Sequence, residues 1–181
     1  MSQSTPTTEL ALLGFLHREP MHGYAIHQQL ADPQGLGPVW QVKQSLLYAM
    51  LGKLEDAGYI TAVSEAQDNK PPRKVFHLTE EGEKVYLGWL GSPVQNGRSL
   101  RLEFLVKLYF ARREGANFTA RLMTAQRAQC HAWLAAERAI IDKEKACGRQ
   151  YSCLVHQFRL GQIQAMIDWL DQCEEEKFHE K

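Results

Sequence analysis

The side chains best suited to binding a ligand lie on one face of a helix predicted over residues 43–57. At ~100° per residue, this helix divides into an apolar arc and a polar or small arc. The apolar arc contains Leu46, Leu47, Met50, Leu51 and Leu54, and the opposite arc contains Gln41, Gln44, Ser45, Tyr48, Ala49 and Gly52. No carboxylate occurs from Trp40 to Leu54. A helix that lies against phosphates needs that absence, because a carboxylate there weakens binding.

The polar arc carries groups that can recognise a DNA duplex. Gln44 can hydrogen-bond to adenine, Ser45 to either type of base, and Tyr48 to a phosphate oxygen. A solvated amphipathic helix would show the same division, so the arc by itself leaves both interpretations open.

A second candidate group is a basic cluster between two predicted strands. Residues 59–63 and 75–78 are β-prone, and the polar segment between them predicts a hairpin with a long tip. Lys70, Arg73 and Lys74 lie in this segment beside two prolines, which stiffen it. Three cations on a rigid tip suit phosphate or minor-groove contact, although a solubilising loop would have a similar composition.

The elements that position these groups follow the order of a winged helix-turn-helix. The predicted helices cover residues 8–18, 22–30 and 43–57, and a fourth helix begins after the hairpin. Gly58 suits the end of the third helix, and Thr79 suits the N-cap of the fourth. The capping box is incomplete because Gly82 stands where Glu or Gln is usual. This order predicts a winged helix-turn-helix DNA-binding domain over residues 1–92.

Residues 92–97 mark a boundary, after which the chain is predicted to be almost entirely helical. Helices are expected over residues 99–113, 117–147 and 151–173, with a turn near Gly148. Two series have heptad spacing: Phe118, Leu122, Ala125, Gln129, Ala132, Ala136 and Ile140, and Tyr151, Val155, Phe158, Gln162, Ala165 and Trp169. One neighbour cannot cover stripes this broad, so we expect a helical, coiled-coil-like dimerisation domain over residues 98–175. The fold class is therefore mainly α.

Several segments resemble the PadR family of transcriptional regulators over about residues 8–90. They are Leu10–Gly14, Pro20–Tyr24, Leu47-Tyr48, Leu54–Ile60 and Pro71–Gly82. Arg101–Ala111 and the helices after it resemble, more loosely, the C-terminal domain of the virulence-activator branch of that family. The resemblance implies a dimeric winged-helix DNA binder, usually a repressor and sometimes an activator. It implies a recognition helix around Gln44–Lys53 and a wing at Lys70–Lys74.

Two positions depart from the family pattern. Ala49 stands where many members have Pro, and Gly52 stands where a basic residue is common, beside the retained Lys53. Gly52 removes a phosphate contact and costs roughly 1 kcal/mol of helix stability relative to Ala. The predicted DNA-binding residues are Gln44, Ser45, Tyr48, Lys53, Lys70, Arg73 and Lys74.

The predicted function is that of a sequence-specific transcriptional repressor that acts as a homodimer on a palindromic operator. The alternative is a protein-interaction module that kept the scaffold without operator binding. Trp89, Tyr109 and Phe110 can also line a site for a small aromatic effector, next to a flexible linker at Gly91–Gly97. Effectors of that type occur in the resembled family, while core packing is the other explanation for these three aromatic residues.

Other chemistries find little support in the sequence. His17, His22 and His27 are spaced by five residues and do not share a helix face, so we predict no metal site and expect His22 to cap a helix. Cys130, Cys147, Cys153 and Cys173 form no C-x-x-C pair and are expected to be reduced, with a redox sensor as the alternative. No catalytic triad or nucleotide-binding loop is evident, so we predict neither an enzyme nor a cofactor.

The composition bounds the remaining possibilities. The 181 residues include 21 basic and 21 acidic side chains, so any contact with DNA must depend on a local patch. No apolar run approaches the ~20 residues of a membrane span, and the N-terminus lacks the features of a signal peptide. We therefore expect a soluble, cytoplasmic protein that does not contact a membrane.

Overall fold

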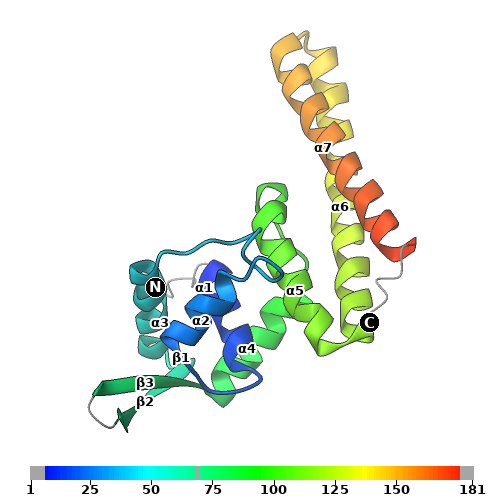
Figure 1. The fold of residues 1–181 in the computed structure, drawn as a ribbon. Helices are drawn as coiled ribbons and strands as arrows, with labels where there is room; N and C mark the ends of the chain where they lie inside the picture. Colours follow the sequence, from blue (N-terminus) through cyan, green and yellow to red (C-terminus); the bar gives the residue numbers. More distant parts are fainter. Residues whose placement is uncertain (1–6, 68–69, 176–181) are drawn as a thin grey trace.

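The protein is a winged helix-turn-helix from which a long pair of helices projects (Figure 1). The computed structural model describes residues 7–67 and 70–175. Its elements are α1 (Thr7–Leu16), β1 (Met21–His22), α2 (Gly23–Leu30), α3 (Gln44–Asp56), β2 (Ile60–Gln67), β3 (Lys70–Leu78), α4 (Glu80–Gly91), η1 (Gly97–Ser99), η2 (Leu100–Phe104), α5 (Leu105–Glu114), α6 (Ala116–Ala146) and α7 (Gln150–Glu175). The predicted fold class, mainly α with a winged helix-turn-helix, is confirmed.

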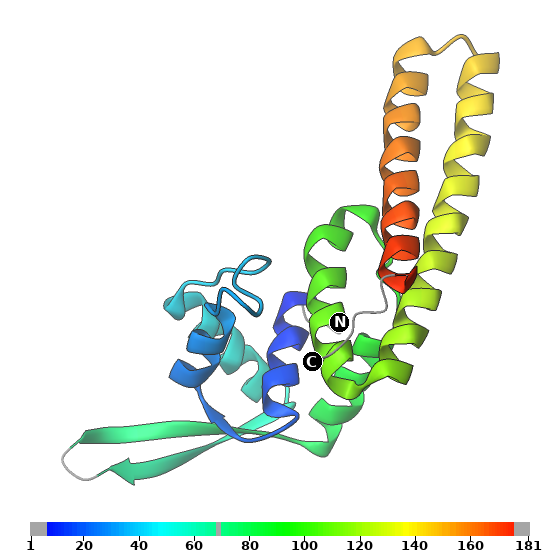
Figure 2. The ribbon, with the colours of Figure 1, turned by 45° about the vertical axis from the view of Figure 1, so that its right-hand side comes forward.

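Helix α1 lies at the centre of the winged-helix region. The helix predicted over residues 8–18 is present, and every residue from Ala11 to Leu16 is buried. The reason is that α5 covers a second side of α1, as Figure 2 shows. The Phe110 ring of α5 packs edge-on against Phe15 with centroids 5.1 Å apart, and a methyl group at Gly14 would lie 2.7 Å from the same ring. A helix that is apolar all round is buried all round.

The wing is longer and more regular than its composition predicts. The three strands are antiparallel in the order β1-β3-β2, and Val63 pairs with Val75 and Glu65 with Arg73. The polar segment that we expected to form a long tip is therefore mostly strand. β1, which we did not predict, covers the other edge of β3 at Val75 and Phe76. The distal part of β3 keeps an open edge, where proline is tolerated.

The start of α4 explains the incomplete capping box. The Thr79 hydroxyl accepts a hydrogen bond from the Gly82 N–H at 3.0 Å, as expected for an N-cap. A side chain at Gly82 would begin 2.0 Å from the carbonyl oxygen of Tyr59. Glycine is therefore required there because the turn after α3 approaches α4 too closely for a Cβ atom. Gly58, in that turn, has the positive φ of 75° that its predicted position requires.

The linker between the two regions is held in place, which corrects the prediction that Gly91–Gly97 is flexible. Val94 is fully buried, and its N–H donates to Oε1 of the buried Gln126 on α6 at 2.7 Å. The Ser92 carbonyl accepts from the Lys107 ammonium at 3.0 Å. Because these buried polar groups satisfy the linker backbone, the linker acts as a strut between the winged helix and the helix pair.

Helices α6 and α7 form an antiparallel pair, but the buried stripe is not the predicted one. The turn lies at Gly148, as expected, with a φ of 67°. The interior contains Leu122, Met123, Gln126, Cys130, Leu134 and Ile141 of α6 and Cys153, Ile163, Ile167, Leu170 and Cys173 of α7. Of the predicted heptad positions, Leu122 is buried, Phe118, Ala125, Gln129, Val155 and Trp169 are half-buried, and Ala132, Ala136, Ile140, Tyr151, Phe158, Gln162 and Ala165 are exposed.

Each long helix therefore carries two apolar stripes. The other helix of the pair covers one stripe, and much of the second stripe remains exposed to solvent. Over residues 7–67 and 70–175, no helix is both long enough and apolar enough to cross a membrane.

Candidate nucleic-acid interface

Helix α3 is held by its apolar arc and presents its polar arc to solvent. Leu47, Met50, Leu51 and Leu54 are buried in the core, as predicted. Leu46 was predicted to join them, but it is 55% exposed. At ~100° per residue it stands about 90° from the centre of the buried arc, so the core does not reach it.

The exposed side of α3 brings together the three residues predicted to read DNA. Gln44, Ser45 and Tyr48 are all exposed, as is the small Ala49 between them and the next turn. Gln44 is the first residue of the helix and Ser45 follows it, so both lie at the N-terminal end of α3. This is the end that a recognition helix directs at base edges. A Cβ at Gly52 would meet nothing within 4 Å, so this departure from the family pattern leaves an open surface.

Tyr48 also fixes how α3 crosses α2. Its ring lies against Gly23, the first residue of α2, so closely that a methyl group there would be 2.7 Å away. Tyr48 nevertheless remains 43% exposed. The phenol is therefore held by packing and keeps an accessible polar end, which suits a phosphate contact that sets register. His22 is the N-cap residue of α2, as expected, but its side chain makes no capping hydrogen bond.

Lys53 is exposed on α3, but its ammonium already has a partner. Its Nζ atom donates to Oε1 of Glu9 on α1 at 2.7 Å. The Lys53 side chain is 62% exposed, whereas that of Glu9 is only 5% exposed. No role for Glu9 could be predicted from local spacing, because the two residues are 44 positions apart. The one available signal is an acidic residue at the start of an otherwise apolar helix.

The wing lies beside the C-terminal end of α3. Arg73 and Lys74 are exposed on β3, and Nζ of Lys74 lies 3.6 Å from a carboxylate oxygen of Glu55 on α3. Both partners of this pair are solvent-exposed, so its energy is small. The side chain of Lys70 lies outside the described part of the chain. The fold thus places Lys74 of the predicted wing next to α3.

The three predicted effector residues lie at the junction of α4 and α5, where Trp89 and Phe110 pack against Tyr86 and Tyr109 packs against Phe110. The Phe110 ring lies 6.2 Å from Tyr86 and 5.1 Å from Tyr109, and Trp89 lies 6.3 Å from Tyr86. Trp89 and Phe110 are buried, while Tyr109 is half-buried. Burial raises the pKa of the Tyr109 phenol.

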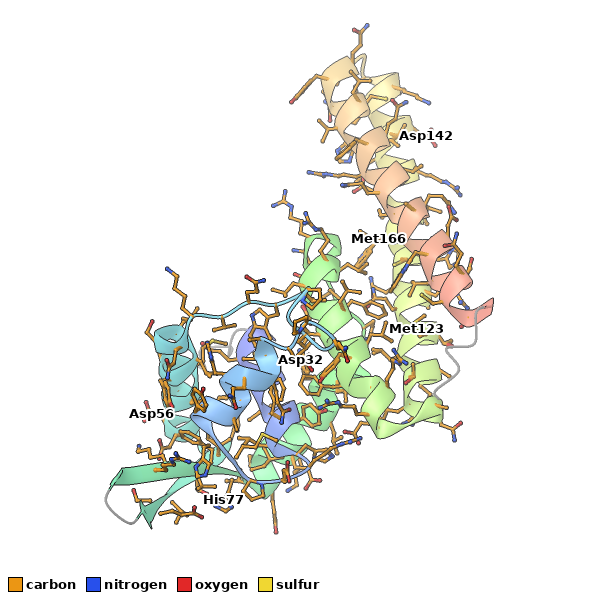
Figure 3. The ribbon with its side chains drawn as sticks, in the orientation of Figure 1. Asp32, Asp56, His77, Met123, Asp142 and Met166 are labelled. Carbon is orange, nitrogen blue, oxygen red and sulfur yellow. The ribbon has the colours of Figure 1, made fainter. Side chains whose placement is uncertain are left out.

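The loop between α2 and α3 reaches this junction. Its Leu36 and Trp40 are buried, and a methyl group at Gly35 would lie 3.4 Å from the Tyr109 hydroxyl. Figure 3 shows Asp32, at the start of the loop, close to α5. The loop leads directly into Gln44. The loop therefore connects its contact with α5 to the N-terminal end of α3.

A buried lysine, Lys107, lies beside Trp89 at this junction. The Lys107 ammonium is 3.0 Å from Glu103 and lies over the Trp89 ring, 5.1 Å from its centroid. Burial lowers the pKa of Lys107, and the Glu103 carboxylate opposes that shift. The sequence predicted neither this lysine nor Gln126, since both lie within otherwise ordinary helical patterns.

Outside this junction, an open cavity of about 290 Å³ lies between the end of α1, the end of β3 and the start of α4. It is lined by polar side chains that include His17, His77 and Glu83, and not by the predicted effector residues. All four cysteines are free, and Cys147 alone among them is exposed. No cluster of three potential metal-binding side chains occurs within the described ranges.

A helix with an exposed polar arc, supported by two further helices and flanked by a basic two-stranded wing, defines a winged-helix transcriptional regulator. The comparisons with known proteins agree. Residues 12–87 match the transcriptional regulator PadR-like family, and residues 100–176 match the virulence activator alpha C-terminal family. The chain therefore combines a region similar to PadR-like transcriptional regulators with a C-terminal region similar to the virulence-activator type, and these matches are to families of regulators and not of enzymes.

Individual relatives are more distant. A curated relative, the negative transcriptional regulator PadR of Bacillus subtilis, is 33% identical over 100 residues, which are 55% of this chain and 54% of that protein. The chain therefore matches about half the length of this relative. Bacillus subtilis PadR solved in complex with operator DNA is 25% identical with a TM-score of 0.49, covering 94% of this chain and 97% of that one. A Streptococcus mutans protein is 22% identical with a TM-score of 0.44, covering 91% and 96%.

Proposed function

We propose that the protein binds duplex DNA in a sequence-specific manner, with α3 in the major groove and the β2–β3 wing against the neighbouring backbone. The observation that carries this proposal is the exposed arc of α3. It presents Gln44, Ser45 and Tyr48 together, and no carboxylate lies on the helix before Glu55. An amide and a hydroxyl at the N-terminal end of such a helix are the groups that discriminate base edges.

The proposed contacts divide by chemistry. Gln44 and Ser45 contact bases, and Tyr48 contacts a phosphate and sets the register of the helix. Lys53, Lys70, Arg73 and Lys74 face phosphates, and the three wing cations supply most of the electrostatic affinity. The short distance between Lys74 on β3 and Glu55 on α3 supports a common surface for wing and recognition helix.

We further propose that the protein is a homodimer and that residues 98–175 form the dimerisation domain, with residues 1–92 as the DNA-binding domain. The support is the outward side of α7, where Tyr151, Leu154 and Phe158 are 81%, 63% and 67% exposed. These residues follow one another at helical spacing, and large apolar side chains grouped in this way mark an interaction surface. A symmetric dimer presents two recognition helices, so the expected operator is palindromic.

The proposed sign of regulation is repression. The support is the curated relative, which is named a negative transcriptional regulator. A promoter that contains the operator should be more active in a strain without the protein. Lower activity in that strain would indicate an activator.

Replacing Lys74 with Ala should weaken binding to every DNA sequence and lower the salt dependence of the binding constant by about one unit for each wing that contacts DNA. The reason is that an exposed wing lysine releases one counterion when it meets a phosphate. The measurement is the binding constant from gel shifts or fluorescence anisotropy at several salt concentrations, using DNA from upstream of the protein's own gene and an unrelated duplex.

Lys145→Ala is the matched control, because it removes the same charge from the far end of α6. An unchanged salt dependence in Lys74→Ala would remove the wing from the interface. If the native protein shifted neither duplex at low salt, the alternative of a protein-interaction module would stand instead. The carboxylate partners of Lys53 and Lys74 favour that alternative.

We also propose that a small, flat aromatic compound binds at the junction formed by Trp89, Tyr109 and Phe110 and releases DNA. The support is the α2–α3 loop, which contacts Tyr109 of α5 at Gly35 and leads into Gln44. Phenols, aromatic acids and cationic dyes should quench tryptophan fluorescence and lower operator affinity at the same concentrations, with a coupling of ~1–3 kcal/mol. Trp89→Phe should abolish the quenching. If no compound produced both effects, the junction would be a rigid strut.

A further inference from the structure

The ion pair between Glu9 and Lys53 joins the first turn of α1 to the exposed face of α3. The Nζ to Oε1 distance is 2.7 Å, and the two side chains have very different environments, 5% exposed for Glu9 and 62% for Lys53. We infer that Glu9 is a specificity-determining residue, which neutralises the one lysine of the recognition helix and so limits sequence-independent affinity for DNA. This inference rests on the proposed function.

The pair is expected to persist when DNA binds. If Lys53 left Glu9, a carboxylate that is almost fully buried would lose its charge partner, which is strongly unfavourable. Lys53 does not need to leave, because an ammonium group has three donors and Glu9 takes one of them. The exposed side of the ammonium can therefore hydrogen-bond a phosphate while Glu9 holds it in place.

The consequence concerns the balance between charge and hydrogen bonding on α3. From Gln44 to Leu54, Lys53 is the single charged residue of the helix. With Glu9 beside it, the pair has no net charge, so its approach to a phosphate releases little of the condensed counterion. The recognition helix then binds through positioned hydrogen bonds, which depend on sequence, more than through charge, which does not.

The wing provides a contrast on the same surface. Lys74 lies 3.6 Å from Glu55, and both side chains are substantially exposed, at 60% and 36%. Such a pair is weak and screened by salt, so Lys74 is free to exchange its partner for a phosphate. The wing therefore supplies the sequence-independent part of the affinity for DNA. Because Glu9 neutralises Lys53, α3 contributes little to that part.

The experiment uses the full chain with Glu9→Gln, because the glutamine amide oxygen can still accept from Lys53 while the negative charge is lost. Binding constants are measured for an operator duplex and a random-sequence duplex between roughly 50 and 200 mM salt. In the variant, the salt dependence should be steeper by about one unit per subunit for both duplexes. When the salt concentration is lowered over that range, the affinity of the variant should rise about threefold more per subunit than the affinity of the native protein. The ratio of operator binding to random-sequence binding should fall.

Asp142→Asn is the matched control, since it changes the net charge by the same amount at the remote end of the helix pair (Figure 3). It should leave both salt dependences unchanged. The double variant Glu9→Gln with Lys53→Met removes both charges, so it should return to the native salt dependence. It also tests the inference if Glu9→Gln alone fails to fold, because replacing both partners leaves no buried charge.

Two results would overturn the inference. One is a folded Glu9→Gln variant with the native salt dependence. The other is a double variant whose salt dependence lies about one unit per subunit below the native value, because Lys53 would then act as a free cation in the native protein. If the native protein bound neither duplex at the lowest salt, the proposed function itself would fail, which is a different outcome.

Discussion

Replacing Phe158 with Glu should produce a folded monomer whose operator affinity is lower by about 100-fold or more. In a dimer, the second half-site binds as an intramolecular event, and such coupling adds roughly 10²–10⁴ to the overall affinity. Phe158 is 67% exposed on α7, so a charge there should not disturb the core of one chain. It would, however, bury a charge in a dimer contact made by Tyr151, Leu154 and Phe158. Sedimentation at micromolar concentration measures the assembly, and gel shifts measure the affinity.

The control for this experiment is Gln157→Glu, which places the same charge on the neighbouring exposed residue but off the apolar stripe. It should remain dimeric and bind DNA normally. The native protein must itself be a dimer at this concentration. A native chain that sedimented as a monomer, or a Phe158→Glu variant that stayed dimeric, would move the dimer contact elsewhere or remove it.

Replacing Gln44 with Ala should relax the choice of base at one position in each half-site while leaving non-specific binding nearly unchanged. A bidentate glutamine–adenine contact contributes about 1–3 kcal/mol of discrimination, and a symmetric operator contains it twice. Gln44 is exposed at the first position of α3, so the substitution removes no buried contact. The measurement is affinity across a set of operators in which each base pair is changed in turn.

Gln150→Ala serves as the control, because it removes an exposed glutamine from the first position of α7. It should preserve the complete pattern of base preference. If Gln44→Ala lost affinity equally for every duplex, Gln44 would be a phosphate contact. If the base preference of Gln44→Ala matched that of the native protein, the N-terminal end of α3 would not contact bases in the groove.

The local elements of the DNA-binding region could be predicted because their signals lie within a few residues of one another. The period of Leu47, Met50, Leu51 and Leu54 defined the buried side of α3, and its polar side followed. Gly58 and Thr79 were recognisable as helix boundaries, because a positive φ and an N-cap hydroxyl are properties of single positions. The length of the wing was less predictable, since strand pairing between Glu65 and Arg73 depends on both partners.

The helix pair shows where local patterns become ambiguous. α6 and α7 each carry enough apolar residues for two stripes, and heptad spacing describes both. On α7, the stripe predicted from heptad spacing contains Phe158, whereas the residues that are buried against the rest of the chain are Ile163, Ile167 and Leu170. Which stripe is buried depends on how the turn at Gly148 orients the two helices, and that orientation is a property of the assembled pair.

The sequence by itself determined the class of fold, the position of helix α3 and the chemical character of its exposed arc, because each depends on residue types at short spacing. The tertiary structure alone decided the hydrogen bond between the linker residue Val94 and Gln126, and the ion pair between Glu9 and Lys53. These contacts join residues 32 and 44 positions apart. Their partners meet only after α1, α3, α6 and the linker have packed, so no periodicity along the chain could have indicated them.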